Sequence, residues 1–467
     1  MEIEEKMKQL HKNEIDMTTG PILRKMLIFA IPVVFSGLLQ FFFNAADVMV
    51  VGRFAGDEAL AAVGVSSSPT HLVVNVLIGM GTGVNVVVAR AFGAGREKDI
   101  SQAVHTSVLL SIIGGVIVAI IGLVFSEKLL LVMGTDAEVL PLAKEYLDII
   151  FMGTPILAMY NFGAAILRAK GDTKRPLYYL SFAGVLNVLL NLYFVIVLKL
   201  GVKGVAMSTV LSQILSAILV LGCLRREEGA FKLELKKLGL TWSKVKPIMV
   251  IGIPTGIQGM LFSVSNMAVQ SSINAFGKIF MAGSSAASSI EAFTFISMDG
   301  FSQSAVSFTS QNIGAGKNER VPQILKISTI CTSIAGLSMG ILSFVFGRYL
   351  LGIYSPNPAV IDAGMVRLMY ISAPYFLCGT MNVIASVIRG MGYSVIPTIT
   401  TLIGVCAFRI VWLAGIAKIP QASSIAWVYL AYPVSWLITA LTLYLYFRHV
   451  YAKNSRQRIS DETLQPV

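Results

Sequence analysis

Residues 167–176 read L-R-A-K-G-D-T-K-R-P, and residues 388–397 read I-R-G-M-G-Y-S-V-I-P. At this offset of 221 residues, an arginine, a glycine and a proline of the first stretch align with the same residue types in the second. The same offset relates A-F-G-A-G-R at 91–96 to N-I-G-A-G-K at 312–317. The chain therefore contains two similar halves, and its fold follows from what one half builds.

The composition indicates the environment in which these halves fold. Of the 467 residues, 55% are hydrophobic and only 13% are charged, and the mean hydropathy is +0.74. Soluble globular domains carry about 25% charged residues. A chain this apolar lacks the polar surface that a water-soluble fold needs, so we predict a polytopic membrane protein.

Twelve apolar stretches are long enough to cross a bilayer as helices, because lipid leaves no other way to satisfy the backbone. We place them at residues 26–51, 58–89, 100–125, 141–168, 177–199, 203–224, 244–272, 281–311, 322–347, 360–389, 394–416 and 422–448. Six fall in each repeat, so the two copies have the same orientation in the membrane. The predicted fold class is an all-α polytopic membrane protein with twelve transmembrane helices in two pseudo-symmetric six-helix bundles.

The distribution of basic residues predicts the orientation of the chain. The net charge is +12, and most of the 37 Lys and Arg residues lie at the termini and in the even-numbered connections between spans. Basic loops mark the cytoplasmic side. We therefore expect both termini in the cytoplasm and the chain in the plasma (inner) membrane, with the lipid bilayer as its partner. Because the charges are spread over short loops, we predict no nucleic-acid partner.

The repeat and the spans together predict the domain organisation. A cytoplasmic N-terminal segment (1–25) precedes an N-lobe of six helices (26–224). A cytoplasmic linker (225–246) leads to a C-lobe of six helices (247–448), and residues 449–467 form a cytoplasmic tail. The linker alternates apolar and basic residues, which fits either a segment lying on lipid headgroups or a solvated one.

Asp47 is a carboxylate inside an apolar span. It follows the uncharged run Met26–Phe43, and ionisation there is penalised by several kcal/mol. Asn44 lies on the same helix face, while Asn187 and Asn191 share one face of another predicted helix. A carboxyl group among neutral amides suits reversible binding of a proton. The alternative is a packing hydrogen bond that never changes protonation.

The second half carries different buried charges. Glu291 lies about 10 residues, and Arg409 about 8 residues, from the outer ends of their helices, which places both at roughly 12–15 Å depth. The matched depths predict a buried Glu291–Arg409 ion pair, which would offset the cost of burying each charge alone. Two roles stay open for it. The pair is either a static strut, or Glu291 exchanges Arg409 for a cationic drug or a proton.

An ordered set of motifs resembles the multidrug and toxic-compound extrusion (MATE) family. These are D-V-M-V-V-G-R at 47–53, the loop at 91–96, the loop at 167–176 and G-V-K-G-V-A at 201–206. The resemblance implies two six-helix bundles in a V shape around a central cavity. It also implies export of organic, often cationic compounds against an inward flow of protons or sodium ions.

The resemblance also implies roles for particular residues. Asp47 matches the acidic cation-coupling residue of helix 1, Asn187 matches an Asn of helix 5, and Thr209 matches a Thr of helix 6. Asn191 stands where one branch of the family has Asp. Sodium favours anionic oxygen ligands, so the loss of this second carboxylate weakens a sodium site, whereas a proton needs only one.

Another branch of the family uses acidic residues in helices 7 and 10, and that site is not carried over. Helix 7 of this chain has no acid there and offers Gln270, and helix 10 has Asn382 near the expected place. Together with Glu291 and Arg409, these residues are the candidates for substrate contacts in the C-lobe.

These observations favour a secondary antiporter that exports cationic or amphipathic drugs or toxins by alternating access of two lobes. The alternative is a lipid-linked oligosaccharide flippase of the same superfamily, which would prefer a strongly basic cavity. We take Arg409 as the only cation deep in a span, and a single cation argues against the flippase alternative. H-E-x-x-H does not occur, and we predict no enzyme. We expect no cofactor beyond H⁺ or Na⁺, no metal site and a monomer.

Overall fold

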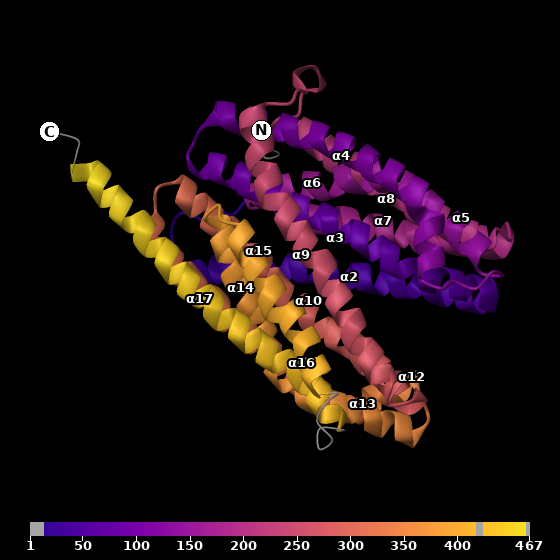
Figure 1. Cartoon of the computed structure of the whole chain (residues 1–467). Helices are drawn as coiled ribbons and strands as arrows, with labels where there is room; N and C mark the ends of the chain where they lie inside the picture. The colour runs from indigo at the N-terminus through magenta and orange to yellow at the C-terminus, as the bar shows by residue number, and fades with distance from the viewer. Residues whose placement is uncertain (1–13, 417–423, 464–467) are drawn as a thin grey trace. The chain divides into compact units, whose positions relative to one another are not determined.

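The computed structural model describes residues 14–416 and 424–463, and within them every regular element is a helix (Figure 1). Residues 1–13 and 464–467 of the predicted terminal segments, with 417–423, lie outside the described residues. In the described part, 10 helices are long and apolar enough to cross a membrane. The number is 12 when each of two bent helix pairs counts as one span. The predicted all-α membrane fold is confirmed.

The first repeat contains six spans. They are α2 (Ile22–Phe54), α3 (Asp57–Gly93), α4 (Glu97–Val132), the bent pair α5 (Leu140–Met152) and α6 (Thr154–Lys170), α7 (Lys174–Leu192) with the π-helix η1 (Tyr193–Val197), and α8 (Gly201–Arg226). The bent pair turns by 46°. Gly153 stands at the break, and a proline directly follows Thr154. A proline has no N–H for the preceding turn, which accounts for the bend there.

The second repeat follows a linker with two short 3-10 turns, η2 (Gly229–Phe231) and η3 (Leu235–Lys237). Its helices are α9 (Trp242–Asn274), α10 (Lys278–Gly314), η4 (Asn318–Arg320) with α11 (Val321–Val345), the short α12 (Gly347–Tyr354), the bent α13 (Pro358–Ile371), η5 (Ala373–Tyr375) and α14 (Phe376–Gly390), then α15 (Val395–Thr401), η6 (Leu402–Ala407) and α16 (Phe408–Ile416), and α17 (Ile425–Thr463). The fourth span is bent in both repeats, here by 42°, and the fifth contains a π-helix in both. The repeat read from the sequence therefore extends to helix distortions.

The repeated loop glycines have a conformational role. Gly171 and Gly392, which align in the repeat, have φ values of 105° and 94°. Glycine adopts these left-handed conformations without the steric cost that a Cβ brings. Gly171 is also crowded, because an added Cβ would come within 2.4 Å of the Ile15 carbonyl oxygen. The loop therefore requires glycine both for its turn and for the chain segment that covers it.

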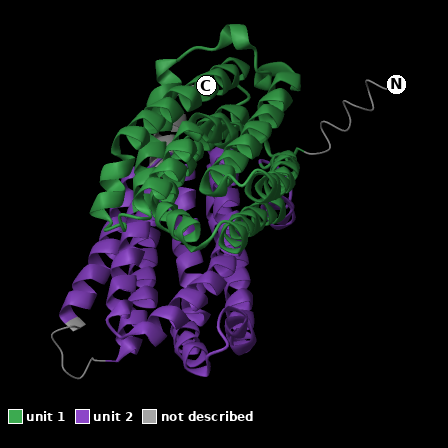
Figure 2. Ribbon diagram, turned by 90° about the vertical axis from the view of Figure 1, so that its right-hand side faces the viewer, with its two compact units in different colours: residues 1–17, 31–260 green, residues 18–30, 261–467 purple. Residues whose placement is uncertain are grey.

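The chain divides into two compact units (Figure 2). Unit 1 comprises Met1–Met17 and Ile31–Met260, and unit 2 comprises Thr18–Ala30 and Leu261–Val467. The divisions fall inside α2 and α9, so each of these helices belongs partly to one unit and partly to the other. The lobes predicted from the sequence end instead at loops and span ends.

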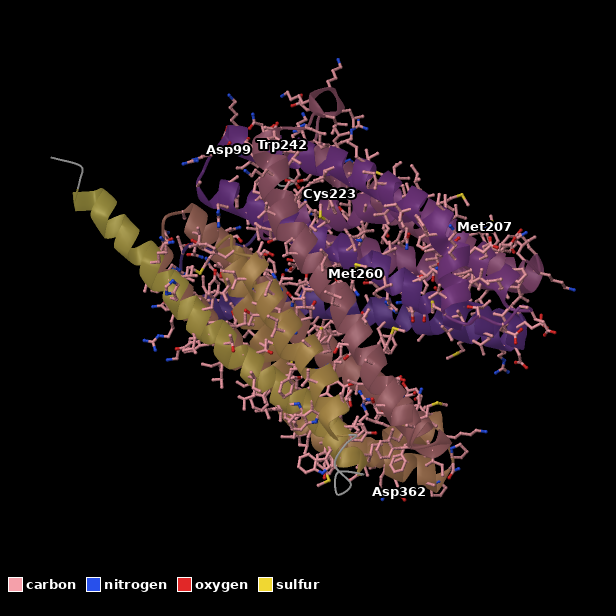
Figure 3. All side chains as sticks on the ribbon, viewed as in Figure 1. Asp99, Met207, Cys223, Trp242, Met260 and Asp362 are labelled. Carbon is pink, nitrogen blue, oxygen red and sulfur yellow. The ribbon has the colours of Figure 1, made fainter. Side chains whose placement is uncertain are left out.

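The linker packs on α4 within unit 1. Phe231 is buried, and the backbone N–H of Glu234 donates to His105 Nε2 at 3.0 Å. Asp99 of α4 and Trp242, the first residue of α9, lie at the same end of the unit (Figure 3). The protein thus covers part of the apolar surface of the linker, which neither the headgroup nor the solvated alternative anticipated.

Each unit has its own apolar core and an apolar exterior. In unit 1 one core cluster joins α3, α4, α6 and α8, and in unit 2 the largest joins α10, α14 and α17. The outer face of α4 remains apolar over several turns, with about half of each side chain exposed at Ile117, Ile120, Ile121 and Val124. An exposed apolar face of this size fits contact with lipid acyl chains.

Candidate functional site

Asp47 lies in unit 1, where three helices place polar side chains around its carboxyl group. It is buried on α2, and its Oδ1 accepts a hydrogen bond from Asn191 Nδ2 of α7. Its Oδ2 lies 3.4 Å from Thr209 Oγ1 of α8. No ion pair to a basic side chain occurs at Asp47 in the described part of the chain. The carboxyl group therefore depends on neutral partners.

Thr209 offers Asp47 two hydrogen-bonding arrangements. Its Oγ1 is 3.0 Å from the carbonyl oxygen of Val205, one turn earlier on α8. A hydroxyl has one hydrogen to donate and lone pairs to accept. It therefore either donates to an ionised Asp47, or donates to Val205 and accepts the proton of a neutral Asp47. The site satisfies both protonation states of the acid without moving the backbone.

Asn187 and Asn191 add two further oxygen atoms from α7. Both side chains are buried, and the Oδ1 of each has no hydrogen-bond partner among the described residues. The π-helix η1 begins two residues after Asn191, and π-helices occur frequently at functional sites. The structure thus brings Asp47, Asn191 and Thr209 into contact and places Asn187 one turn away on the same helix.

The predicted Glu291–Arg409 ion pair is wrong. Glu291 of α10 pairs instead with Arg367 of α13, with Arg367 Nε 2.9 Å from Oε1 and Nη2 2.8 Å from Oε2. Arg367 Nη1 also donates to Ser284 Oγ at 2.8 Å. The rings of Tyr429 and Tyr432 lie within 6 Å of the guanidinium. Glu291 therefore already has a two-point ionic partner in this structure.

Arg367 was missed because it stands in the outer half of a bent span. In a straight helix that starts near residue 360, position 367 lies close to the membrane surface. An arginine there can place its charge at the interface, so a buried ion pair was not predicted. The break near residue 372 tilts α13, and Arg367 is only 5% exposed. The sequence did contain a signal, since the apolar run A-G-M-V-R-L-M-Y interrupted by one charge resembles the run around Asp47. Arg409 is accordingly not the only cation buried in a span.

Among the described residues, Arg409 has neutral partners only. Its side chain is wholly buried in unit 2, with Nε donating to Ser435 Oγ at 3.1 Å and Nη1 donating to Asn266 Oδ1 at 3.0 Å. The ring of Tyr432 lies 4.2 Å from the guanidinium carbon. Cation–π contact of this kind stabilises a desolvated cation by about 2 kcal/mol.

The other two C-lobe candidates lie apart from these charges. Gln270 Nε2 donates to Asn274 Oδ1 at 3.0 Å on the same helix. Among the described residues, the one contact of Asn382 Nδ2 is with the sulfur of Cys378, at 3.8 Å. Neither side chain bonds Glu291 or Arg409 in the described residues, so the structure does not assemble the four candidates into one site.

A network of buried charges surrounds the repeated 167–176 loop. Lys170 bonds Glu14 at 2.5 Å and Glu227 at 2.6 Å, and Arg175 pairs with both Asp172 and Glu227. Burial opposes ionisation of Glu227, but its contacts with Lys170 and Arg175 outweigh burial and hold the pKa of this carboxyl below its usual value. Lys170, Asp172 and Arg175 of the loop are therefore engaged in ion pairs within the protein.

No metal centre is formed in the part of the chain that the structure describes, where no group of three His, Cys, Asp or Glu side chains is placed to hold an ion. The four cysteines are all buried and unpaired with one another. The candidate chemistry is therefore carried by the Asp47 cluster and by the buried arginines of unit 2.

Comparison with known proteins identifies the family. The family model MatE matches residues 32–193 and 254–413, one segment in each repeat. The probable multidrug resistance protein YoeA of Bacillus subtilis is 26% identical over 444 residues, covering 93% of this chain and 96% of that protein. The probable multidrug resistance protein NorM of Thermotoga maritima is 28% identical over 408 residues, covering 86% of this chain and 87% of that protein.

Solved structures agree on the fold. The outward-facing conformation of a multidrug resistance MATE family transporter of the MOP superfamily superposes with a TM-score of 0.88 at 21% identity. The match covers 94% of this chain and 97% of that one. Because the family model covers more than half of the sequence and both repeats, the chain belongs to the MATE family of multidrug efflux transporters.

Proposed function

We propose that this protein is a secondary antiporter that exports organic, cationic or amphipathic small molecules in exchange for inward-moving protons. The Asp47 cluster is the observation that carries the proposal. A buried carboxyl group with neutral partners is poised to bind and release a small cation. In this family context, such a group supplies the coupling that an exporter needs.

Hydrogen-bond geometry supports the proton as the coupling ion. Thr209 accepts from a neutral Asp47 while it donates to the Val205 carbonyl, and donates to Asp47 when the acid is ionised. A sodium ion would instead use the oxygen atoms of Asp47, Asn187 and Asn191. That set contains one anionic side chain, and hard cations prefer carboxylate ligands.

Coupling requires that the affinity of Asp47 for the proton differs between two conformations. A ligand shifts a conformational equilibrium only by its differential affinity for the two states. We propose that the two lobes alternate between outward- and inward-open states, with both termini in the cytoplasm of a plasma-membrane protein that works as a monomer. No further cofactor enters this scheme.

Transport in proteoliposomes tests the proposal. Proton and sodium gradients are imposed separately, and efflux of ethidium is followed for the wild type, Asp47→Asn and the control Asp57→Asn, which alters an exposed acid in the first turn of α3. We expect the pH gradient to drive efflux in the wild type and the control but not in Asp47→Asn. Undiminished pH-driven efflux in Asp47→Asn would remove this residue from the coupling role.

A further inference from the structure

We propose that Arg409 is the centre of a second ligand site, within unit 2, that binds the carboxylate of an aromatic, zwitterionic substrate. The inference rests on the proposed export function for its physiological meaning, and it adds a chemical class of substrate to it.

Lys170 and Arg367 are also buried, and each contacts at least one carboxylate. Arg409 is 0% exposed, yet its described hydrogen bonds go only to Asn266 and Ser435. A cation removed from water without a counter-ion is costly, and an anion bound beside Arg409 would offset that cost.

Two hydrogen-bond donors at this place have no acceptor among the described residues. They are Arg409 Nη2 and Trp436 Nε1, both buried. The Trp436 ring centre lies 5.7 Å from the Arg409 guanidinium carbon. A buried donor without a partner costs about 1–3 kcal/mol. A carboxylate has two oxygen atoms and accepts from a guanidinium at two points, so it fits this excess of donors.

Asn266 supplies the exposed side of the site. Its Oδ1 accepts from Arg409 Nη1 at 3.0 Å, and its side chain is exposed on α9. The ring centre of Phe262, one turn earlier on α9, lies 5.8 Å from the Arg409 guanidinium carbon, and this side chain is partly exposed. Rotation of the Asn266 side chain frees Nη1 without any change in the backbone. The aromatic rings of Phe262, Tyr432 and Trp436 suit a flat aromatic body attached to the carboxylate.

The internal repeat relates this site to the Asp47 cluster. Ile31-Pro32 returns as Ile253-Pro254, and the same offset of 222 relates Asn44 to Asn266. The first, fifth and sixth spans of the first repeat supply Asp47, Asn191 and Thr209. The corresponding spans α9, α15–α16 and α17 of the second repeat supply Asn266, Arg409 and Ser435. Equivalent helices thus hold an acid in one repeat and a base in the other.

Binding of two matched fluorescent probes tests the inference. One is a rhodamine with a free carboxylate, and the other is its methyl ester, which keeps the rings and the cationic charge. Binding to the purified full-length protein is followed by fluorescence anisotropy, with no ion gradient present. A charge-assisted two-point hydrogen bond predicts that the wild type binds the acid at least about tenfold more tightly than the ester.

Asn266→Asp is the decisive variant, because it adds a carboxylate at an exposed position beside Arg409. The new acid pairs with the guanidinium, so we expect the preference for the free acid to disappear while ester binding changes little. The control Asn274→Asp adds the same charge at another exposed position of α9 and should keep the preference. Arg409→Gln, where it folds, should also lose it.

Two results would overturn the inference. They are equal affinity of the wild type for acid and ester, and equal loss of the preference in Asn266→Asp and Asn274→Asp. The assay is independent of ion coupling, and Asp47→Asn should retain the preference for the acid. A transport failure that leaves this preference intact therefore counts against the antiport proposal alone.

Discussion

Arg367 and Glu291 form a two-point ion pair between α13 and α10, with both nitrogen-to-oxygen distances below 3 Å. Neither side chain is more than 6% exposed. The pair therefore lies in a low-dielectric environment, where each charge depends strongly on the other.

Removing one partner of this pair should destabilise the protein more than removing both. Arg367→Met and Glu291→Gln each leave a buried charge or its polar partners uncompensated, and we expect each to cost about 3–5 kcal/mol. The double variant should recover much of that loss. Thermal unfolding of the four proteins in detergent measures the effect, and strictly additive losses would show that the pair is not coupled.

Asn191→Asp should increase the sodium dependence of transport. The substitution places a second carboxylate beside Asp47, which already accepts a hydrogen bond from Asn191. Two adjacent acids do not ionise together readily, but a bound sodium ion offsets their repulsion. We expect sodium-driven efflux to appear or to rise several-fold, measured in proteoliposomes without a pH gradient. Asn191→Ser, which adds no charge, serves as the control, and an equal rise there would contradict the explanation.

The hydroxyl group of Thr209 should contribute to pH-driven efflux by hydrogen bonding to Asp47 in both of its protonation states. Thr209→Val keeps the shape of the side chain but removes the acceptor for a neutral Asp47 and the donor for an ionised one. One hydrogen bond contributes about 0.5–1.5 kcal/mol, so we expect pH-driven efflux to fall by roughly two- to tenfold. Thr209→Ser keeps the hydroxyl and should stay near the wild type. Equal rates for all three proteins would show that Thr209 has no part in coupling.

Replacing Gly79 even by alanine should destabilise the protein. A Cβ at this position of α3 would lie 2.2 Å from the backbone nitrogen of Gly256, in the part of α9 that belongs to unit 1. Overpacking of this kind costs about 1–3 kcal/mol. Gly64→Ala in the same helix meets no atom within 4 Å and should be neutral or slightly stabilising. The two melting temperatures make the comparison, and equal values would contradict the close helix contact.

The contribution of Glu227 to stability should depend on pH. Its ion pairs with Lys170 and Arg175 hold the pKa of this carboxyl below the ordinary value of 4.5. A lowered pKa in the folded state means that the stabilisation is complete above about pH 4.5 and is lost as the pH falls through the folded value. The difference in melting temperature between wild type and Glu227→Gln should therefore be largest near neutral pH and should disappear at acidic pH. Glu228→Gln, at the exposed neighbouring position, should show no such gap.

The sequence predicted the helices well because membrane spans are long and uniformly apolar. The twelve predicted spans correspond to helices, and the repeat explains why the fourth span bends in both halves. Asp47, Asn191 and Thr209 were identified together by resemblance to a family, and the structure brings them into contact. These features depend on local composition or on an ordered set of motifs, and both are present in one sequence.

The partner of Glu291 could not be read from depth alone. Two charges at similar depth pair only when their helices are neighbours and their side chains face each other, and α10 meets α13 rather than α16 at this residue. The rotation of each helix and the 42° bend near residue 372 determine which side chains face each other. The division of α2 and α9 between units likewise depends on packing, which no single span reveals.

The shared helices have a consequence for the history and engineering of the chain. Each repeat contributes the beginning of its first helix to the other unit, as Thr18–Ala30 and Trp242–Met260 show. This is the pattern of a swapped dimer whose two protomers have been fused end to end. Severing the polypeptide in the linker would therefore not yield two autonomous halves, and function would return only when both fragments are produced in the same cell.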